Sequence, residues 1–451
     1  MKIVIVGCGK VGRKIADELV KEGHDLVLID RDAEIVESTC TALDVLGVVG
    51  DATDMETLRE ADIENADVLL AVTESDEKNL LCCLFAKKAG NVKTIARVRE
   101  PNYDEGINFI REELGLAMAI NPERAAANSI ASLIKFPNAV EIEQFAKGMV
   151  ELLGFVVPDN SILVDNEIMN VIPSLNTQVL ICGIERGDEV IIPNGHTVIR
   201  RGDKVFVIAN ANKSGEFFEK VGLLPKRIRK AMIVGGSRIA YYLSKELIAS
   251  RIDVCIIEEN KSTCERLAEL LPEAHIICGD GSSQELLEEE GIRETEAFVS
   301  LTNMDEQNVL LSLYAKNSTN AKTVTKVNHI SYDDLISRLD LGSIICPKDI
   351  TADSITQFVR AMNNASANNV DTLYKILDGN AEALSFTIKE KSEVCDVPLI
   401  NLDTKDDLLI CAIIRNNKVI TPSGKDVIKV GDSVVVVTTH KGLSDIKDIV
   451  K

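Results

Sequence analysis

An internal repeat spans the whole chain and constrains its fold more than any other feature. Residues 2–37 align with residues 230–265 at an offset of 228. From Gly50, which aligns with Gly279, the offset is 229 and stays constant into the last part of the chain. Because two unrelated domains would not hold one register for so long, the sequence predicts a tandem duplication.

Each copy has two parts with different sequence patterns. In the first part, short apolar runs alternate with helical faces such as Val11-x-x-x-Ile15-x-x-x-Leu19, a pattern typical of a parallel doubly wound sheet. The second part has short β-runs separated by turns such as Pro193-Asn194-Gly195. The predicted fold class is therefore α/β, with two Rossmann-like doubly wound parallel sheets, each followed by a small α+β lobe.

The repeat also predicts the domain boundaries. In chain order they are a Rossmann-like lobe at 1–121, a crossover helix at 122–139, a small lobe at 140–223, a linker at 224–230, a second Rossmann-like lobe at 231–346, a crossover helix at 347–368 and a second small lobe at 369–451.

Composition excludes several classes of function. The net charge of −21 disfavours binding to nucleic-acid phosphates or to anionic lipid surfaces. No apolar stretch approaches the roughly 18–20 residues that span a bilayer, so we expect no direct membrane insertion. Met1 leads directly into an apolar strand pattern and the cysteines suit a reducing compartment, so we expect a cytoplasmic protein. The histidines and cysteines show no metal-ligand spacing, so we expect no metal site.

A glycine-rich motif follows the first strand of the first copy. The segment Gly7-Cys8-Gly9-Lys10-Val11-Gly12 fits G-x-G-x-x-G, and Asp30 stands at the end of the second strand. Gly7 permits the turn, Gly9 permits the approach of a pyrophosphate, and Gly12 permits close helix packing. Asp30 would accept hydrogen bonds from a ribose and repel a 2′-phosphate, although Arg31 beside it weakens the case against NADP. The alternative is a Rossmann-like turn without a ligand.

Further candidate ligand contacts lie at the ends of later strands, where ligands collect in such sheets. They are Asp51 and Ala52 after the third strand, Thr73 and Glu74 after the fourth, and Arg97 on the fifth. We expect Arg97 or Arg99 to face the crevice. The alternative for each position is a loop cap or a surface ion pair.

The second copy retains only part of this pattern. Gly235 keeps the first glycine, whereas Ser237 and Ala240 replace the second and third. The counterparts of the strand-end residues are Glu258, Asp280, Thr302 and Lys326. Ser237 should narrow the approach of a phosphate, so the second lobe either binds a nucleotide or is a degenerate structural copy.

The chain lacks the groups that an enzyme of this fold would need. A dehydrogenase requires an acid–base group beside the nicotinamide, and no such constellation stands outside the nucleotide core. We therefore predict no catalytic residues and a sensor function. The rival interpretations are a nucleotide sensor of another transporter or channel family and, less favoured, an NAD-dependent oxidoreductase.

The two-module layout resembles TrkA-type potassium uptake proteins, which contain two RCK modules, each with an N-lobe and a C-lobe. The segments that carry the resemblance are the glycine motif with Asp30, Gly50-Asp51, Ala71-Val72-Thr73-x-x-Asp76-Glu77-x-Asn79, Ala96-Arg97-Val98-Arg99, Gly279-Asp280-Gly281-Ser282, Leu301-Thr302-Asn303-x-Asp305-Glu306-x-Asn308, Pro193-x-Gly195 with Gly202-Asp203, and Pro422-x-Gly424 with Gly431-Asp432.

This resemblance implies a regulatory subunit on the inner face of the cell membrane, docked on a Trk-type potassium-translocating membrane protein. It implies NAD or NADH, ATP or ADP as ligands that gate the pore. In the first module it places the ligand on residues 7–11, Asp30, Thr73, Glu74 and Arg97. It also implies a homotetramer whose eight modules form a ring.

Overall fold

The structure pairs each part of one repeat with its counterpart in the other. The computed structural model describes residues 1–103, 106–187, 189–210, 214–223, 228–328, 339, 341–363, 370–377 and 379–451. These residues form two compact units. The Rossmann unit comprises Met1–Ala131 and Arg229–Thr356, and the C-lobe unit comprises Ser132–Ile228 and Gln357–Lys451.

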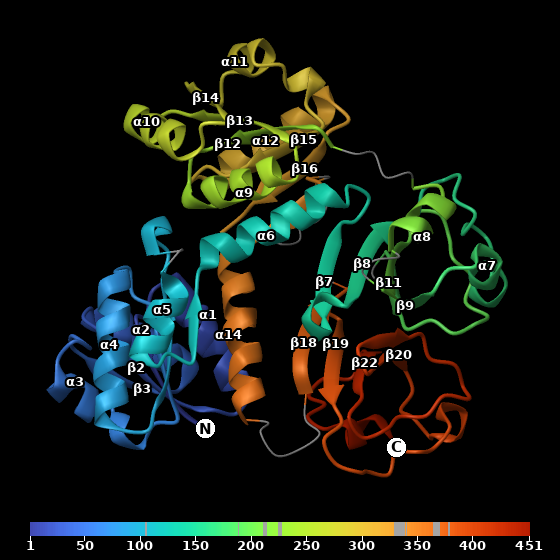
Figure 1. The fold of residues 1–451 in the computed structure, drawn as a ribbon, viewed down its shortest axis with the longest axis horizontal. Coiled ribbons are helices and arrows are strands. Elements are labelled where there is room, and N and C mark those ends of the chain that lie inside the picture. Colours follow the sequence, from blue (N-terminus) through green and yellow to red (C-terminus); the bar gives the residue numbers. More distant parts are fainter. Residues whose placement is uncertain are drawn as a thin grey trace. The chain divides into compact units, whose positions relative to one another are not determined.

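The first lobe of the Rossmann unit contains a six-stranded parallel sheet with strand order β3-β2-β1-β4-β5-β6. Figure 1 labels β2 and β3 of this sheet and its helices α1 to α5. The strands are β1 (Lys2–Val6), β2 (Asp25–Asp30), β3 (Leu46–Val49), β4 (Val68–Ala71), β5 (Lys93–Arg97) and β6 (Met118–Ile120). The connecting helices are α1 (Lys10–Lys21), α2 (Ala33–Leu43), α3 (Met55–Glu60), α4 (Asp76–Ala89) and α5 (Ile107–Leu114). The central strands β1 and β4 are buried almost throughout, as helices on both faces of a sheet require.

The second lobe repeats this topology in the order β14-β13-β12-β15-β16-β17. Its strands are β12 (Lys230–Val234), β13 (Asp253–Glu258), β14 (His275–Cys278), β15 (Ala297–Ser300), β16 (Lys322–Lys326) and β17 (Ser343–Ile345). Its helices are α9 (Arg238–Ala249), α10 (Lys261–Leu270), α11 (Gln284–Glu289) and α12 (Asp305–Ser318). The predicted fold class of two Rossmann-like sheets is confirmed.

A crossover helix that begins with proline follows each sheet: α6 (Pro122–Lys135) and α14 (Pro347–Asn363). Lys14 on α1 pairs with Asp349 on α14 at 3.4 Å, so the second crossover helix contacts the first lobe. The predicted linker at 224–230 includes residues 224–227, which lie outside the described residues, and Lys230 already belongs to β12. Residues 364–368 of the predicted second crossover helix, and residue 369, also lie outside the described residues.

The C-lobe unit contains two five-stranded antiparallel sheets, in the orders β10-β9-β11-β8-β7 and β18-β19-β22-β20-β21. The first lobe has β7 (Glu141–Phe145), β8 (Val150–Val156), α7 (Ile168–Leu175), β9 (Val179–Arg186), β10 (Glu189–Ile191), β11 (Lys204–Asn210) and α8 (Ser214–Lys220). The second has β18 (Val370–Ile376), β19 (Ala381–Thr387), β20 (Leu408–Arg415), β21 (Lys418–Ile420) and β22 (Ser433–Thr438). One apolar core joins both lobes, with Phe145 and Phe206 packed among residues such as Ile376 and Val435.

The repeated Gly-Asp motif of the C-lobes supplies the aspartate of an arginine–aspartate ion pair, here called the C-lobe lock. Gly202 has a φ of +78°, a conformation that favours glycine. The next residue, buried Asp203, accepts hydrogen bonds from Nε and Nη2 of Arg186 at 2.9 and 2.8 Å. Asp432 accepts the same pair of bonds from Arg415 at 2.8 and 2.7 Å. The motif therefore conserves a bidentate ion pair that closes each lobe.

Among the described residues, no helix is both long enough and apolar enough to cross a bilayer.

Candidate functional site

Two of the three motif glycines in the first lobe are required by the fold itself. Gly7 has a φ of +102°, and a Cβ there would lie 3.0 Å from the backbone nitrogen of Thr73. A Cβ on Gly12 would collide with the carbonyl oxygen of Gly7. Both positions therefore need glycine whether or not a ligand binds.

Gly9 differs, because nothing in the described structure requires a glycine there. Its φ is −68°, which any residue adopts, and a Cβ would meet no atom within 4 Å. Gly9 is the N-cap of α1 and offers no side chain to the first turn, so the N–H groups of that turn stay available to an anion. The space in front of Gly9 is therefore open to a ligand, as the motif predicts.

The structure places the carboxylate of Asp30 beside the glycine loop. Its oxygens accept hydrogen bonds from the backbone N–H of Cys8 at 2.6 Å and of Asp32 at 3.2 Å. The side chain of Cys8 is buried in the opposite direction, with its thiol directed to the carbonyl of Ile29, so only the backbone of Cys8 faces the site. Asp30 is thus held in position with remaining lone pairs to accept ribose hydroxyls.

The neighbouring predicted residues have different environments. Arg31 forms an ion pair with Asp51, so its guanidinium is already engaged by a carboxylate. Ala52 is buried in the apolar core below the loop and presents no surface to the crevice. Lys10 is exposed at the start of α1, Glu74 is exposed at the end of β4, and these two side chains are free to meet a ligand.

A buried asparagine fixes the ends of the central strands. Asn79 accepts hydrogen bonds from the N–H and hydroxyl of Thr73 at 2.9 and 2.7 Å and donates to the carbonyl oxygen of Arg97 at 2.9 Å. Asn308 makes the same three contacts to Thr302 and Lys326 in the second lobe. These two asparagines hold β4 to β5 and β15 to β16 at the carboxyl ends of the strands. Both are part of the sequence repeat, but the sequence analysis assigned them no role.

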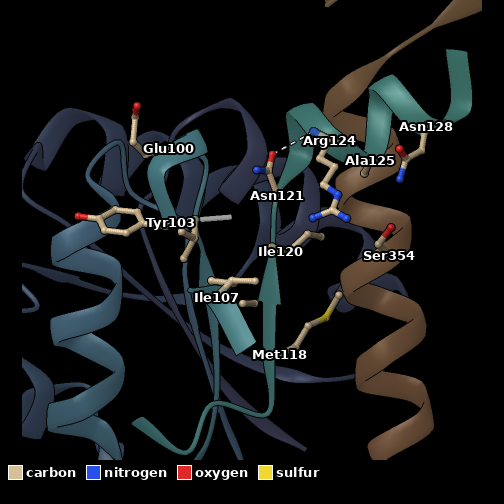
Figure 2. A pocket seen from close by; sticks show the side chains of 12 residues that line it. Glu100, Tyr103, Ile107, Met118, Ile120, Asn121, Arg124, Ala125, Asn128 and Ser354 are labelled. Carbon is tan, nitrogen blue, oxygen red and sulfur yellow. Dashed lines mark hydrogen bonds between the residues drawn. The ribbon is translucent and has the colours of Figure 1, made fainter. Parts of the chain in front are cut away.

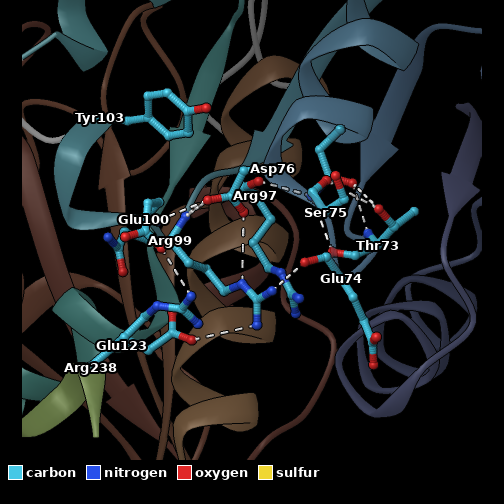
Figure 3. A network of polar contacts seen from close by, with 12 residues as sticks. Thr73, Glu74, Ser75, Asp76, Arg97, Arg99, Glu100, Tyr103, Glu123 and Arg238 are labelled. Carbon is cyan, nitrogen blue, oxygen red and sulfur yellow. Dashed lines mark hydrogen bonds and ion pairs between the residues drawn. The ribbon is translucent and has the colours of Figure 1, made fainter. Parts of the chain in front are cut away.

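Of the two arginines at the end of β5, one is paired and the other is not. The guanidinium of Arg99 lies 3.7 Å from Asp76 and 3.9 Å from Glu123, and it also donates to the carbonyl of Glu74 (Figure 3). Arg97 is only 8% exposed, yet no described residue forms an ion pair or a hydrogen bond with its guanidinium. Burial lowers the pKa of Arg97, because desolvation disfavours the charged guanidinium. Arg97 is the arginine that retains an unused donor set.

Arg97 lines a cavity of about 510 Å³, here called the central chamber, which lies between the two glycine loops. Its lining includes five cationic residues and one carboxylate: Lys10, Arg97, Arg238, Lys326, Lys348 and Glu123. Lys326, the counterpart of Arg97, is 5% exposed, and burial lowers its pKa. Arg238 bridges the lobes through an ion pair of 3.0 Å with Glu100. The chamber therefore carries excess positive charge and suits a polyanion such as a pyrophosphate.

Sequence reasoning missed Glu123, Arg238 and Lys348 as chamber residues. Glu123 and Lys348 each follow the proline that begins a crossover helix, and Arg238 is the repeat counterpart of Lys10. Burial raises the pKa of Glu123, and the guanidinium groups of Arg99 and Arg97 act against that shift. Arg238 could have been predicted, because the repeat aligns it with Lys10. Glu123 and Lys348 could not, because only the tertiary packing of the crossover helices brings them to the chamber.

The second lobe has a crevice of about 640 Å³ at the matching strand ends. It brings together the four residues predicted there: Gly235, Glu258, Asp280 and Thr302. The carboxylate of Glu258 accepts from the backbone N–H of Gly236 at 2.5 Å and of Asn260 at 2.7 Å, as Asp30 does from its own loop. Asp280 accepts from the N–H and hydroxyl of Ser282, which lower its pKa.

The two glycine replacements have local consequences in the second loop. Ser237 is the N-cap of α9, and its hydroxyl accepts from the N–H of Ala240 at 3.4 Å. One N–H of the first turn is therefore directed to the protein itself, whereas α1 has no such cap. Ala240 is fully buried at the position of Gly12, so its methyl group has been accommodated. The second loop keeps the crevice but offers fewer free donors.

A third cavity of about 300 Å³ lies beside α6 and lacks these features (Figure 2). Ile107, Met118 and Ile120 form its apolar side, and Asn121 and Arg124 its polar side. It contains none of the predicted site residues and no glycine loop, so we assign the ligand site to the loops and the central chamber instead.

No group of three or more potential metal ligands occurs in the described part of the chain. The site thus consists of carboxylates that accept hydrogen bonds, backbone N–H groups and cations. Such groups bind and orient a nucleotide.

Comparison with known proteins places this geometry in a family. The TrkA-N domain family matches residues 3–122 and 231–347, and the TrkA-C domain family matches residues 152–222 and 383–451. The Trk system potassium uptake protein TrkA homolog of Archaeoglobus fulgidus is 32% identical over 450 residues, which cover 100% of both chains. The Trk system potassium uptake protein TrkA of Halomonas elongata is 32% identical over 447 residues, 98% of this chain and 96% of that relative.

Solved structures support the fold. The GsuK channel bound to NAD superposes with a TM-score of 0.63 at 15% identity and covers 98% of this chain and 77% of that one. GsuK bound to ADP gives a TM-score of 0.51 at 14% identity, with 79% of this chain and 69% of that one covered. The resemblance predicted from the motifs is confirmed at the level of the family and the fold.

Proposed function

The chain belongs to the family of Trk system potassium uptake proteins of the TrkA type, and from this premise we propose that it is a nucleotide-responsive regulatory subunit of a potassium uptake system. It is a transport-system protein and not an enzyme. In the proposal, the bound nucleotide controls a Trk-type potassium-translocating membrane protein, which this chain contacts from the inner face of the cell membrane.

The observation that carries the proposal is the excess of positive charge that the two buried cations, Arg97 and Lys326, bring to the strand ends. Burying an ionised group costs several kcal/mol unless a counter-charge compensates it. Arg97 and Lys326 both line the central chamber, whose five cationic residues face only one carboxylate, that of Glu123, so their charge is only partly compensated. Phosphate groups of a nucleotide on the first glycine loop would supply it, since Lys10 and Val11 of that loop line the same chamber.

The geometry favours NAD or NADH, ADP or ATP over NADP. Asp30 is held where a ribose would lie, and its charge would repel a 2′-phosphate. Arg31 is the residue that could have attracted such a phosphate, but it is paired with Asp51. The solved GsuK structures with NAD and with ADP agree with this ligand class.

Control of transport would follow from differential binding. Crossover helix α14 is tied to the first lobe by the Lys14–Asp349 pair, and Arg238 of the second lobe is tied to Glu100 of the first. A ligand that changes these contacts would shift the population of lobe arrangements. In a homotetramer, eight such modules would form a ring that transmits the shift to the membrane protein.

Calorimetric titration of the purified chain with NADH, NAD, ADP, ATP and NADP tests the proposal. We expect saturable binding of at least one of the first four ligands and weaker binding of NADP. Asp30→Ala should weaken dinucleotide binding by about 1–3 kcal/mol, the value of charged hydrogen bonds. Asp25→Ala, an exposed acid at the start of the same strand, is the matched control and should leave binding unchanged.

Absence of saturable binding by all five ligands would refute the nucleotide proposal. A potassium-flux measurement with the co-reconstituted membrane protein then tests control. Nucleotide-dependent flux that Asp30→Ala reduces supports the regulatory function, and flux that is indifferent to nucleotide refutes it.

A further inference from the structure

Two thiols of the second lobe meet at the carboxyl end of β13. Cys264 lies on α10, and its Sγ donates to the carbonyl oxygen of Glu258 at 3.3 Å. Cys278 ends β14, opposite Glu258 in the parallel register, and its Sγ donates to the next carbonyl, that of Glu259, at 3.9 Å. Because both sulfurs approach consecutive carbonyl groups of one strand end, they are close neighbours.

The two thiols differ in access to solvent. All eleven cysteines lie within the described residues, and of these Cys278 alone is exposed, whereas Cys264 is 8% exposed. Burial, together with a hydrogen bond to the Cys278 thiol, raises the pKa of Cys264 to about 11. An exposed cysteine next to a buried one matches the roles of an attacking and a resolving thiol.

The fold does not require cysteine at either position. The repeat places Val36 of the first lobe at the position of Cys264, and Val49 at the position of Cys278. The β2–β3 register aligns Val49 with Asp30 as the β13–β14 register aligns Cys278 with Glu258. The first lobe therefore supplies a shape-matched control for both thiols.

We propose that Cys264 and Cys278 form a reversible disulfide modification site, oxidised by low-molecular-mass disulfides. The thiolate of Cys278 attacks one sulfur of the small disulfide, whose S–S bond breaks, and the released thiolate takes up a proton. The thiol of Cys264 then loses its proton to solvent and attacks the Cys278 sulfur, which releases the second small thiol. Two protein thiols are oxidised to one disulfide while one small disulfide is reduced to two thiols.

The bond would act on the crevice of the second lobe. Cys264 stands between Thr263 and Arg266, two α10 residues that line the crevice. Oxidation removes the hydrogen bond from Cys264 to the Glu258 carbonyl and draws α10 toward β14. The carboxylate of Glu258 is the group expected to meet a ribose, so the oxidised lobe should bind its ligand more weakly.

Peptide mapping by mass spectrometry after treatment of the full chain with hydroxyethyl disulfide tests the modification. We expect a Cys264–Cys278 cross-linked peptide that has lost two hydrogens and that a reducing agent restores. Cys264→Val should instead accumulate the mixed disulfide on Cys278, and Cys278→Val should block reaction at both positions. A mixed disulfide that persists on Cys278 in the unmodified sequence, or cross-links to other cysteines, would overturn the proposal.

The effect on ligand binding is measured in the Asp30→Ala background, in which the first site is weakened and the titration reports mainly the second. Oxidation should weaken this residual binding several-fold, and the Cys264→Val/Cys278→Val double variant should not respond to oxidant. Equal affinity of the oxidised and reduced forms would overturn the effect on the crevice. The mass measurement needs no nucleotide, so failure of the proposed function and failure of the modification are distinguishable.

Discussion

Replacing Arg97 and Arg99 separately with methionine should change stability in opposite directions, although Arg97 is the last residue of β5 and Arg99 follows it by two residues. Methionine keeps the length and apolar contacts of the stem and removes the charge. Arg97 is buried without a described partner, so Arg97→Met should raise ligand-free stability by about 1–3 kcal/mol, as replacement of buried ionic groups often does. Arg99 neutralises buried Asp76, so Arg99→Met should lower stability by about 1–3 kcal/mol.

The same Arg97→Met change should weaken the nucleotide. Loss of one charged hydrogen bond to a phosphate is worth about 1.5–3 kcal/mol, which corresponds to a roughly 10- to 150-fold increase in Kd. Urea denaturation of the ligand-free chain and calorimetric titration with the nucleotide measure the two effects on one variant. If Arg97→Met lowers ligand-free stability as Arg99→Met does, then the fold itself uses that guanidinium and the reasoning about a reserved phosphate contact is wrong.

Other contacts lead to further predictions. Burial, followed by the charge of Lys316, lowers the pKa of Lys322 from 10.5 to about 8. Between these pH values the unfolded chain holds a proton that the folded chain has released, so stability should rise with pH across that window. Lys322→Met should remove this rise of stability between pH 8 and 10.5 in urea titrations, and an unchanged pH dependence would contradict this. Asp203→Ala leaves the Arg186 guanidinium of the C-lobe lock without its carboxylate and should cost about 3–5 kcal/mol, whereas Asp159→Ala, at an exposed ion pair, should cost less than about 1 kcal/mol in the same assay. Asn79→Ala breaks the link between Thr73 and β5 and should destabilise by about 2–4 kcal/mol while increasing hydrogen exchange at both strand ends; unchanged exchange would show that the link is dispensable.

The sequence predicted those features that depend on local spacing. The glycine motif, Asp30 and the strand-end positions were found because a strand, a turn and a helix follow one another within about thirty residues, and the repeat doubled the signal. Strand β7 and helix α7 were not predicted. Glu141–Phe145 does not alternate apolar and polar residues, and the short helix α7 contains Pro173, a residue that disfavours a helix interior, although Ile168–Leu175 has a helical period. The sequence also could not predict that Arg99 is paired and Arg97 is not, because Asp76 and Glu123, which pair with Arg99, lie on other elements of the chain.

The central chamber breaks the symmetry of the repeat, and this asymmetry bears on what two modules in one chain can do. Lys10 and Arg97 correspond to Arg238 and Lys326, so the positive charge is kept on both sides. Glu123 and Lys348, which follow equivalent prolines, have opposite charges. Two identical modules would bring either two carboxylates or two ammonium groups to this chamber, and like charges at close range repel. Two different modules in one chain can place one carboxylate and one ammonium group there. The chamber then keeps an excess of positive charge that can bind an anion. We therefore expect the two loops to bind ligands with different affinities, and occupancy of the first to change the affinity of the second through the cations they share.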